Sequence, residues 1–110
     1  MDYKVVNLGF STADAQDVSI SFDGSDLTLT CVNWHGEPVK HVFNDALAYR
    51  WGQDLGSKEV HDDETYEVQN SQWLLQEAPL IGVDPSAYVH LKLCFNARGV
   101  LDVLSRRSDA

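Results

Sequence analysis

The densest group of chemically active side chains in the sequence is acidic. Five carboxylates lie within one short stretch that precedes the helix and the C-terminal strands: Glu59, Asp62, Asp63, Glu64 and Glu67. Clustered carboxylates can hold a hard cation, but the alternating ligand spacing and central glycine of a calcium loop are missing here. The stretch therefore favours a solvated loop or a partner-binding surface, and we expect neither a metal nor a cofactor.

The net charge of the whole chain also favours a partner-binding surface. Seventeen acidic residues against eight basic ones give a net charge of −9 with histidine neutral. Such a surface repels nucleic acid and anionic membranes and attracts basic proteins, although net charge also simply keeps a small protein soluble. We expect no nucleic-acid or membrane partner, and we expect the five carboxylates to contact a basic protein partner.

Catalytic signatures are absent from the sequence. No serine lies in a Gly-x-Ser-x-Gly turn, and no glycine-rich phosphate loop is present. Cys94 and His90 would share one strand face, but about 13 Å of strand rise would separate them, so the histidine cannot activate the thiol. We expect no catalytic residue, and hence a small binding protein without enzymatic activity. One concrete version is a bacterial immunity-type inhibitor of a basic toxin.

Aromatic residues suggest an alternative. Four rings could line a pocket between a sheet and a helix, which would make the protein a small-ligand-binding protein or an enzyme: Trp51, Tyr66, Trp73 and Tyr88. Exposed rings stack on ligands or anchor partners, whereas buried rings fill the core. Because each tryptophan removes a large area from water, we expect at least two of the three tryptophans to be buried.

The C-terminal part of the chain should form the best-defined hairpin. Apolar residues alternate with polar ones over 87–95 and again over 100–105, as in strands with one buried face. Residues 96–99 suit a hairpin loop that ends in glycine. Placing Asn96 opposite Val100 sets the expected register, which pairs Cys94 with Asp102 and His90 with Arg106. With Lys92, Asp102 and Arg107 nearby, the last pair forms a basic spot that holds a small anion or merely steadies the hairpin.

Further strands are expected upstream as a meander. Alternation predicts strands at 18–22, 27–31 and 39–43, and a bulge at 44–45 before the strand resumes over 46–51. A short edge strand is expected at 65–68. Asn70 or Ser71 should cap a helix over about 70–78 that Pro79 ends.

The expected fold is therefore α+β, mainly antiparallel β. It has about six strands in a meander plus the C-terminal hairpin, with the short helix packed on or beside the sheet. We expect one domain over 1–110, with 105–110 as a frayed tail. Cys31 and Cys94 fall on opposite strand faces, so we expect reduced thiols rather than a disulfide. No apolar run or basic leader suggests a membrane span or signal, so we expect a cytoplasmic protein that could form homodimers.

Overall fold

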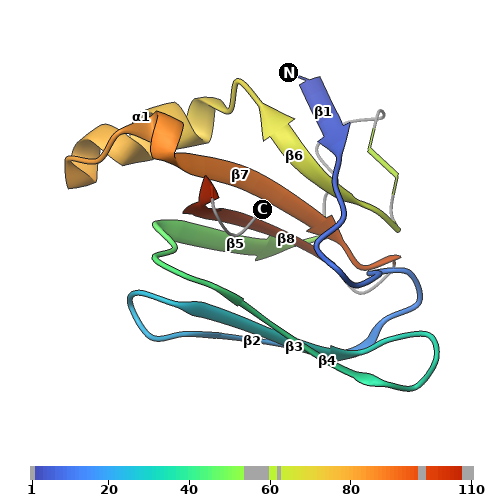
Figure 1. The fold of residues 1–110 in the computed structure, drawn as a ribbon. Coiled ribbons are helices and arrows are strands. Elements are labelled where there is room, and N and C mark those ends of the chain that lie inside the picture. The colour runs from blue at the N-terminus through green and yellow to red at the C-terminus, as the bar shows by residue number, and fades with distance from the viewer. Residues whose placement is uncertain (1, 54–59, 62, 97–98, 108–110) are drawn as a thin grey trace.

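The computed structural model describes residues 2–53, 60–61, 63–96 and 99–107 (Figure 1). Its strands form two stacked antiparallel sheets, and one short helix lies beside the end of the larger sheet. This arrangement confirms the predicted α+β class with a meander and a C-terminal hairpin. In chain order the elements are β1 (Asp2–Val5), β2 (Gln16–Phe22), β3 (Leu27–Val32), β4 (Pro38–Phe43), β5 (Ala48–Gly52), β6 (Thr65–Gln69), α1 (Gln72–Ile81), the 3-10 turn η1 (Pro85–Ala87), β7 (Tyr88–Cys94) and β8 (Val100–Arg106).

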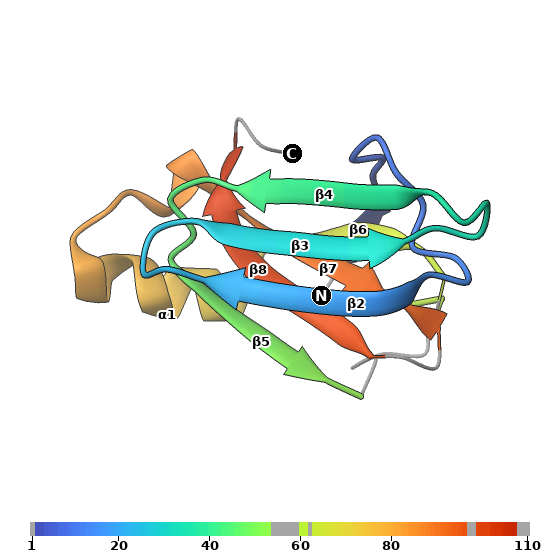
Figure 2. The ribbon, with the colours of Figure 1, turned by 90° about the horizontal axis from the view of Figure 1, so that it is seen from below.

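The two sheets differ in size. The larger sheet has the strand order β1-β6-β7-β8-β5, and the smaller one has the order β2-β3-β4. Figure 2 shows the smaller sheet lying across β7 and β8. The expected edge strand near 65–68 is thus β6, which lies inside the larger sheet between β1 and β7 rather than at its edge.

The main core fills the space between the sheets. Leu29 and Phe43 from the smaller sheet pack in one cluster with Leu91, Leu93 and Leu101 from the larger one, and all five are fully buried. Burying each such side chain contributes about 1.5–3 kcal/mol. The predicted shared interior of the two ribbons is therefore present, and it holds the sheets face to face.

The meander leaves its sheet earlier than the sequence suggested. The expected bulge at 44–45 is a crossing between sheets, because the strand that follows it, β5, pairs with β8 and not with β4. Asp45 takes a positive φ of 50° at the crossing. Ala46 N donates to Ser25 O at 2.7 Å, and Leu47 N already donates to Leu104 O of β8 at 2.8 Å. These two bonds attach the crossing to both sheets.

The C-terminal hairpin forms with its register shifted by two residues from the expected one. Cys94 pairs with Val100 and Lys92 pairs with Asp102, so Tyr88 rather than His90 lies opposite the last residue of β8. The residues that close the loop shift accordingly, and Phe95 N donates to Gly99 O at 2.9 Å. A shift of two residues keeps every side chain on its face, but it changes which side chains are neighbours.

Helix α1 begins as predicted and ends later. Ser71 caps it, with Leu74 N donating to Ser71 Oγ at 3.2 Å. The helix passes through Pro79 and ends at Gly82, which has a left-handed φ of 78°, so the prediction that Pro79 ends it was wrong. Pro79 is exposed near the C-terminal end, where its missing N–H costs one hydrogen bond. Within the described part of the chain, no helix has the length and apolar character needed to cross a membrane.

The ends of the chain and the cysteines complete the fold. Ser105 and Arg106, expected in the tail, form the end of β8, and Ser105 is fully buried. Residues 108–110 lie outside the described part. Cys31 and Cys94 are both buried and neither is in a disulfide. Cys31 belongs to the core between the sheets, and Cys94 belongs to a cluster on the opposite face of the larger sheet.

Candidate functional site

The outer face of the larger sheet, which points away from the smaller sheet, carries a polar strip between two apolar clusters. His90 and Lys92 on β7 and Asp102 on β8 form the strip. The cluster on one side contains Val60, Tyr66, Cys94 and Val100. The cluster on the other side contains Leu74, Ala78, Tyr88 and Leu104, and it holds α1 against the sheet. The strip is therefore enclosed by apolar side chains at both ends.

Four side chains of this region form a continuous hydrogen-bonded chain, here called the polar chain: Ser71, His90, Asp102 and Lys92. Ser71 Oγ lies 2.7 Å from His90 Nδ1, and His90 Nε2 lies 2.7 Å from Asp102 Oδ1. Lys92 Nζ donates to Asp102 Oδ2 at 3.2 Å. All four residues are 4–8% exposed. Both oxygens of the buried carboxylate are thus bonded.

The backbone explains how these residues meet. The hairpin register puts Lys92 directly opposite Asp102, and His90 lies two residues away on the same face of β7. Diagonal neighbours on one face of an antiparallel pair lie within reach of long side chains. Ser71 lies between β6 and α1. It reaches His90 because Asn70, with a positive φ of 54°, turns the chain from β6 into α1.

The electrostatics of the polar chain favour a charged Asp102. Burial by itself would raise the pKa of this carboxyl, but the hydrogen bond from His90 and the charge of Lys92 outweigh it and hold the pKa below its ordinary value. A carboxylate that accepts from Nε2–H leaves Nδ1 as the ring nitrogen with a free electron pair. In that tautomer Ser71 donates its hydroxyl proton to His90 Nδ1.

A tryptophan and an arginine cover the polar chain. The ring of Trp73 meets that of His90 edge to face, with 5.2 Å between centroids. The guanidinium carbon of Arg50 lies 4.0 Å from the centroid of Trp73. Arg50 belongs to β5 and is the cross-strand partner of Asp102. This cover limits the access of water to the middle of the chain.

The two ends of the polar chain reach different pockets. Ser71 and His90 line a pocket of about 370 Å³ between β6, β7 and the start of α1, here called the helix pocket. Lys92 and Asp102 line another of about 320 Å³, together with Arg50 and Trp51. A hydroxyl, an imidazole and a carboxylate in this order can transfer a proton or activate the hydroxyl as a nucleophile. The same bonds also anchor α1 to the sheet.

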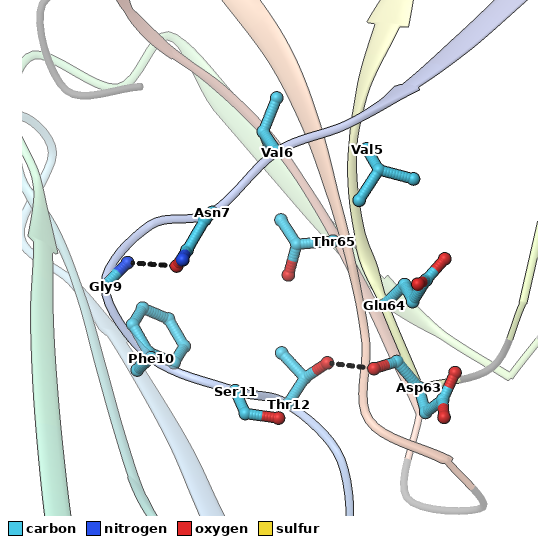
Figure 3. A pocket seen from close by; sticks show the side chains of 10 residues that line it. All are labelled: Val5, Val6, Asn7, Gly9, Phe10, Ser11, Thr12, Asp63, Glu64 and Thr65. Carbon is cyan, nitrogen blue, oxygen red and sulfur yellow. Dashed lines mark hydrogen bonds between the residues drawn. The ribbon is translucent and has the colours of Figure 1, made fainter.

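A third pocket, of about 470 Å³, lies beside β1 (Figure 3) and is here called the β1 pocket. Thr12 Oγ1 donates to Asp63 O at 3.2 Å across it. In Figure 3 the side chain of Thr65 points toward the 7–12 loop, whereas the carboxylates of Asp63 and Glu64 point away from that loop. The acids therefore lie on the outer wall of the pocket.

The structure divides the predicted acidic residues between two places. Glu59 and Asp62 lie outside the described residues. Asp63 and Glu64 line the β1 pocket, and Glu64 accepts a hydrogen bond from Tyr66 at 3.0 Å. Glu67 instead lines the helix pocket, where its Oε2 lies 3.6 Å from Arg107 Nη1. Among the described residues, no group of three or more His, Cys, Asp or Glu side chains is placed to hold a metal ion.

The four aromatic residues expected to line one pocket lie in separate places. Tyr66 and Tyr88 are buried in the two different apolar clusters, and Trp73 lies over His90. Trp51 packs near Phe95, with 5.9 Å between centroids, and is 40% exposed.

The expectation that most tryptophans are buried was wrong. Besides Trp51, Trp34 is 60% exposed, and it stacks on His35 in the turn between β3 and β4. Both tryptophan rings contact another ring, Trp34 that of His35 and Trp51 that of Phe95, while remaining partly exposed.

The sequence placed His90, Lys92 and Asp102 near one another, but it did not predict Ser71 beside them or the hydrogen bonds of the polar chain. Ser71 was recognised only as a helix cap, and His90 was paired with the wrong residue. A signal was present, because strand alternation places His90, Lys92 and Asp102 on one face of the hairpin in any register that puts the two apolar sets on the same face. The contact between Ser71 and His90 has no such signal.

Comparison with known proteins adds no assignment. No family model, no curated protein and no solved structure matches the chain.

Proposed function

We propose that the protein binds a basic protein partner through its acidic region, defined as Glu59, Asp62, Asp63, Glu64 and Glu67. An immunity-type inhibitor of a basic toxin is the most concrete version of this proposal. The single observation that carries it is the net charge of −9. Opposite charge accelerates association with a basic partner and makes the affinity dependent on salt.

Ion pairs within the protein do not reduce this charge. Three described pairs join a base to an acid: Lys92 with Asp102, Arg106 with Asp45, and Arg107 with Glu67. Each pair removes one charge of either sign, so the excess of nine negative charges remains for a partner. Of these pairs, the first is buried, while the cations of the other two are about half exposed.

The position of the acids beside β1 supports the proposed location. Among the described strands, β1 is at one end of the larger sheet, so one side of its backbone has no strand partner. An extended segment can add to such an edge through main-chain hydrogen bonds. Asp63 and Glu64 would then meet basic side chains of that segment next to the apolar wall formed by Val5, Val6 and Phe10.

An oligolysine peptide is a suitable probe, with binding followed by calorimetry and by NMR shifts of the labelled protein across a salt series. The test variant is Asp63→Asn with Glu64→Gln. The matched control is Asp17→Asn with Asp23→Asn on the smaller sheet, which removes the same charge elsewhere. Asparagine tolerates the positive φ of Asp17 and keeps the oxygen through which Asp23 accepts backbone hydrogen bonds.

We expect the test variant to weaken binding several-fold more than the control, and the affinity to fall as salt rises. NMR shifts should concentrate on β1 and residues 63–67. Equal weakening by both variants would mean that only the overall charge matters and would reject the acidic region as the site. An affinity independent of salt would reject the proposal altogether.

A second candidate function is binding or conversion of a small ligand, the alternative expected from the aromatic residues. The helix pocket favours it, because this pocket lies between β6, β7 and the start of α1. Its lining differs from the expectation, since the chemically active groups there are Ser71 and His90 rather than tryptophan and tyrosine rings.

A further inference from the structure

We propose that Ser71 is the nucleophile of an acyl-transfer site, with His90 as its base and Asp102 orienting the imidazole, and that the site acts on small esters entering the helix pocket. This inference goes beyond partner binding and does not depend on it. It also departs from the expectation, drawn from missing sequence motifs, that the chain has no catalytic residue.

The distances within the polar chain are those of an activated hydroxyl. Ser71 Oγ and His90 Nδ1 are 2.7 Å apart, and the second ring nitrogen is equally close to Asp102 Oδ1. A nucleophile within hydrogen-bond reach of a base, with the base oriented by a third group, is the geometric signature of covalent catalysis. The fold differs from Gly-x-Ser-x-Gly enzymes, which explains why no such motif is needed here.

The start of α1 provides a place for the negative charge that develops on the substrate oxygen. The first backbone N–H groups of a helix have no acceptor within the helix, and its N-terminus favours negative charge. Ser71 directly precedes Gln72 and Trp73, whose N–H groups belong to this first turn. Because the nucleophile is the capping residue itself, the developing oxyanion would form close to these donors.

The lining of the helix pocket suggests the substrate class. Leu74 and Leu75 provide apolar lining beside Ser71, and Arg107 and Glu67 lie among the polar lining residues. A volume of about 370 Å³ admits a small molecule rather than a polymer. The site therefore fits a small ester with a short apolar acyl group.

The proposed reaction uses only the ester and water. Ser71 Oγ attacks the ester carbonyl carbon while its proton passes to His90 Nδ1, and a C–O bond forms. The intermediate then collapses, the bond to the alcohol breaks, and His90 returns the proton to the departing alkoxide. Water attacks the resulting acyl-serine in the same way, which releases the carboxylic acid and restores the Ser71 hydroxyl.

The test is covalent labelling of the full-length protein with a fluorophosphonate probe, located by peptide mass spectrometry. Ser86 lines the same pocket and is exposed, so it serves as an internal control serine without a histidine partner. We expect the adduct on Ser71 and not on Ser86. We also expect Ser71→Ala to abolish labelling, and His90→Gln to slow it by about 100-fold or more.

Labelling of the unaltered protein needs no variant, so the test stands even if a variant fails to fold. Labelling rates are compared only for variants that circular dichroism shows to be folded. Turnover of p-nitrophenyl acetate should begin with a burst that Ser71→Ala removes. The proposal is overturned if the probe leaves Ser71 unmodified, or if His90→Gln reacts as fast as the wild type.

Discussion

Lys92 and Asp102 face each other directly across β7 and β8, with 3.2 Å between Nζ and Oδ2, and neither is more than 8% exposed. His90 bonds the other carboxylate oxygen. Removing two charges from water costs several kcal/mol per ion, so such a pair adds little net stability compared with apolar residues. Removing only one of the two charged side chains is costly, however, because the remaining charge then lies buried without its counter-ion.

Lys92→Met should therefore destabilise the protein by about 3–5 kcal/mol. Urea unfolding followed by tryptophan fluorescence measures the change. Lys40→Met is the matched control, since Lys40 is exposed on β4 and its replacement should change stability by no more than about 0.5 kcal/mol. Equal unfolding midpoints for the two variants would contradict a structural role for the buried pair.

Asp102 should make stability fall in acid. Because its folded-state pKa is held below the ordinary value of 3.8, its contribution is complete above that value and is lost as pH falls through the lower folded-state pKa. The stability difference between wild type and Asp102→Asn should accordingly shrink between about pH 5 and pH 2. Denaturant titrations at several pH values measure it. A difference that stays constant across this range would show that Asp102 does not gain its charge stabilisation from His90 and Lys92.

The position of the Trp51 ring leaves no room for a side chain at residue 99, so this residue must be glycine. Gly99 has φ 148°, and a Cβ there would lie 2.4 Å from Trp51 Cζ2, closer than atoms can approach. Gly99→Ala should cost about 1–3 kcal/mol through this overlap and backbone strain. In a Trp51→Ala background the same change should cost less, because the overlap is gone. A double-mutant cycle in urea tests this, and an unchanged cost would assign the whole effect to the backbone.

The two cysteines should react only when the protein unfolds. Cys31 and Cys94 form no disulfide and are at most 4% exposed, and burial raises the pKa of the Cys31 thiol. Ellman's reagent should leave the native protein unmodified for as long as it stays folded and should modify both thiols in denaturant. Reductant should not shift the unfolding midpoint. Rapid reaction of either thiol in the native protein would show that its cover opens readily.

Much of the fold follows from local sequence. Strand alternation predicted the apolar faces of β3, β7 and β8 that pack between the sheets, although the opposite faces of β7 and β8 are buried as well. Ser71 is one of the two residues predicted to cap the helix. Alternation has a period of two, so it assigns a residue to a face even when the register is unknown. The separate faces of Cys31 and Cys94 were predicted for the same reason. Pro79 shows the limit of local rules, because the helix continues through it to Gly82.

The sequence by itself determined which side chains share a strand face, because periodicity is a local property of a strand or helix. Only the tertiary structure decided which side chains meet. The strand β5 pairs with β8 instead of continuing the meander, and the hairpin register places Lys92 opposite Asp102. It also brought Ser71 to His90, nineteen positions away. Such contacts depend on long-range backbone pairing and on how α1 docks, which no local pattern encodes.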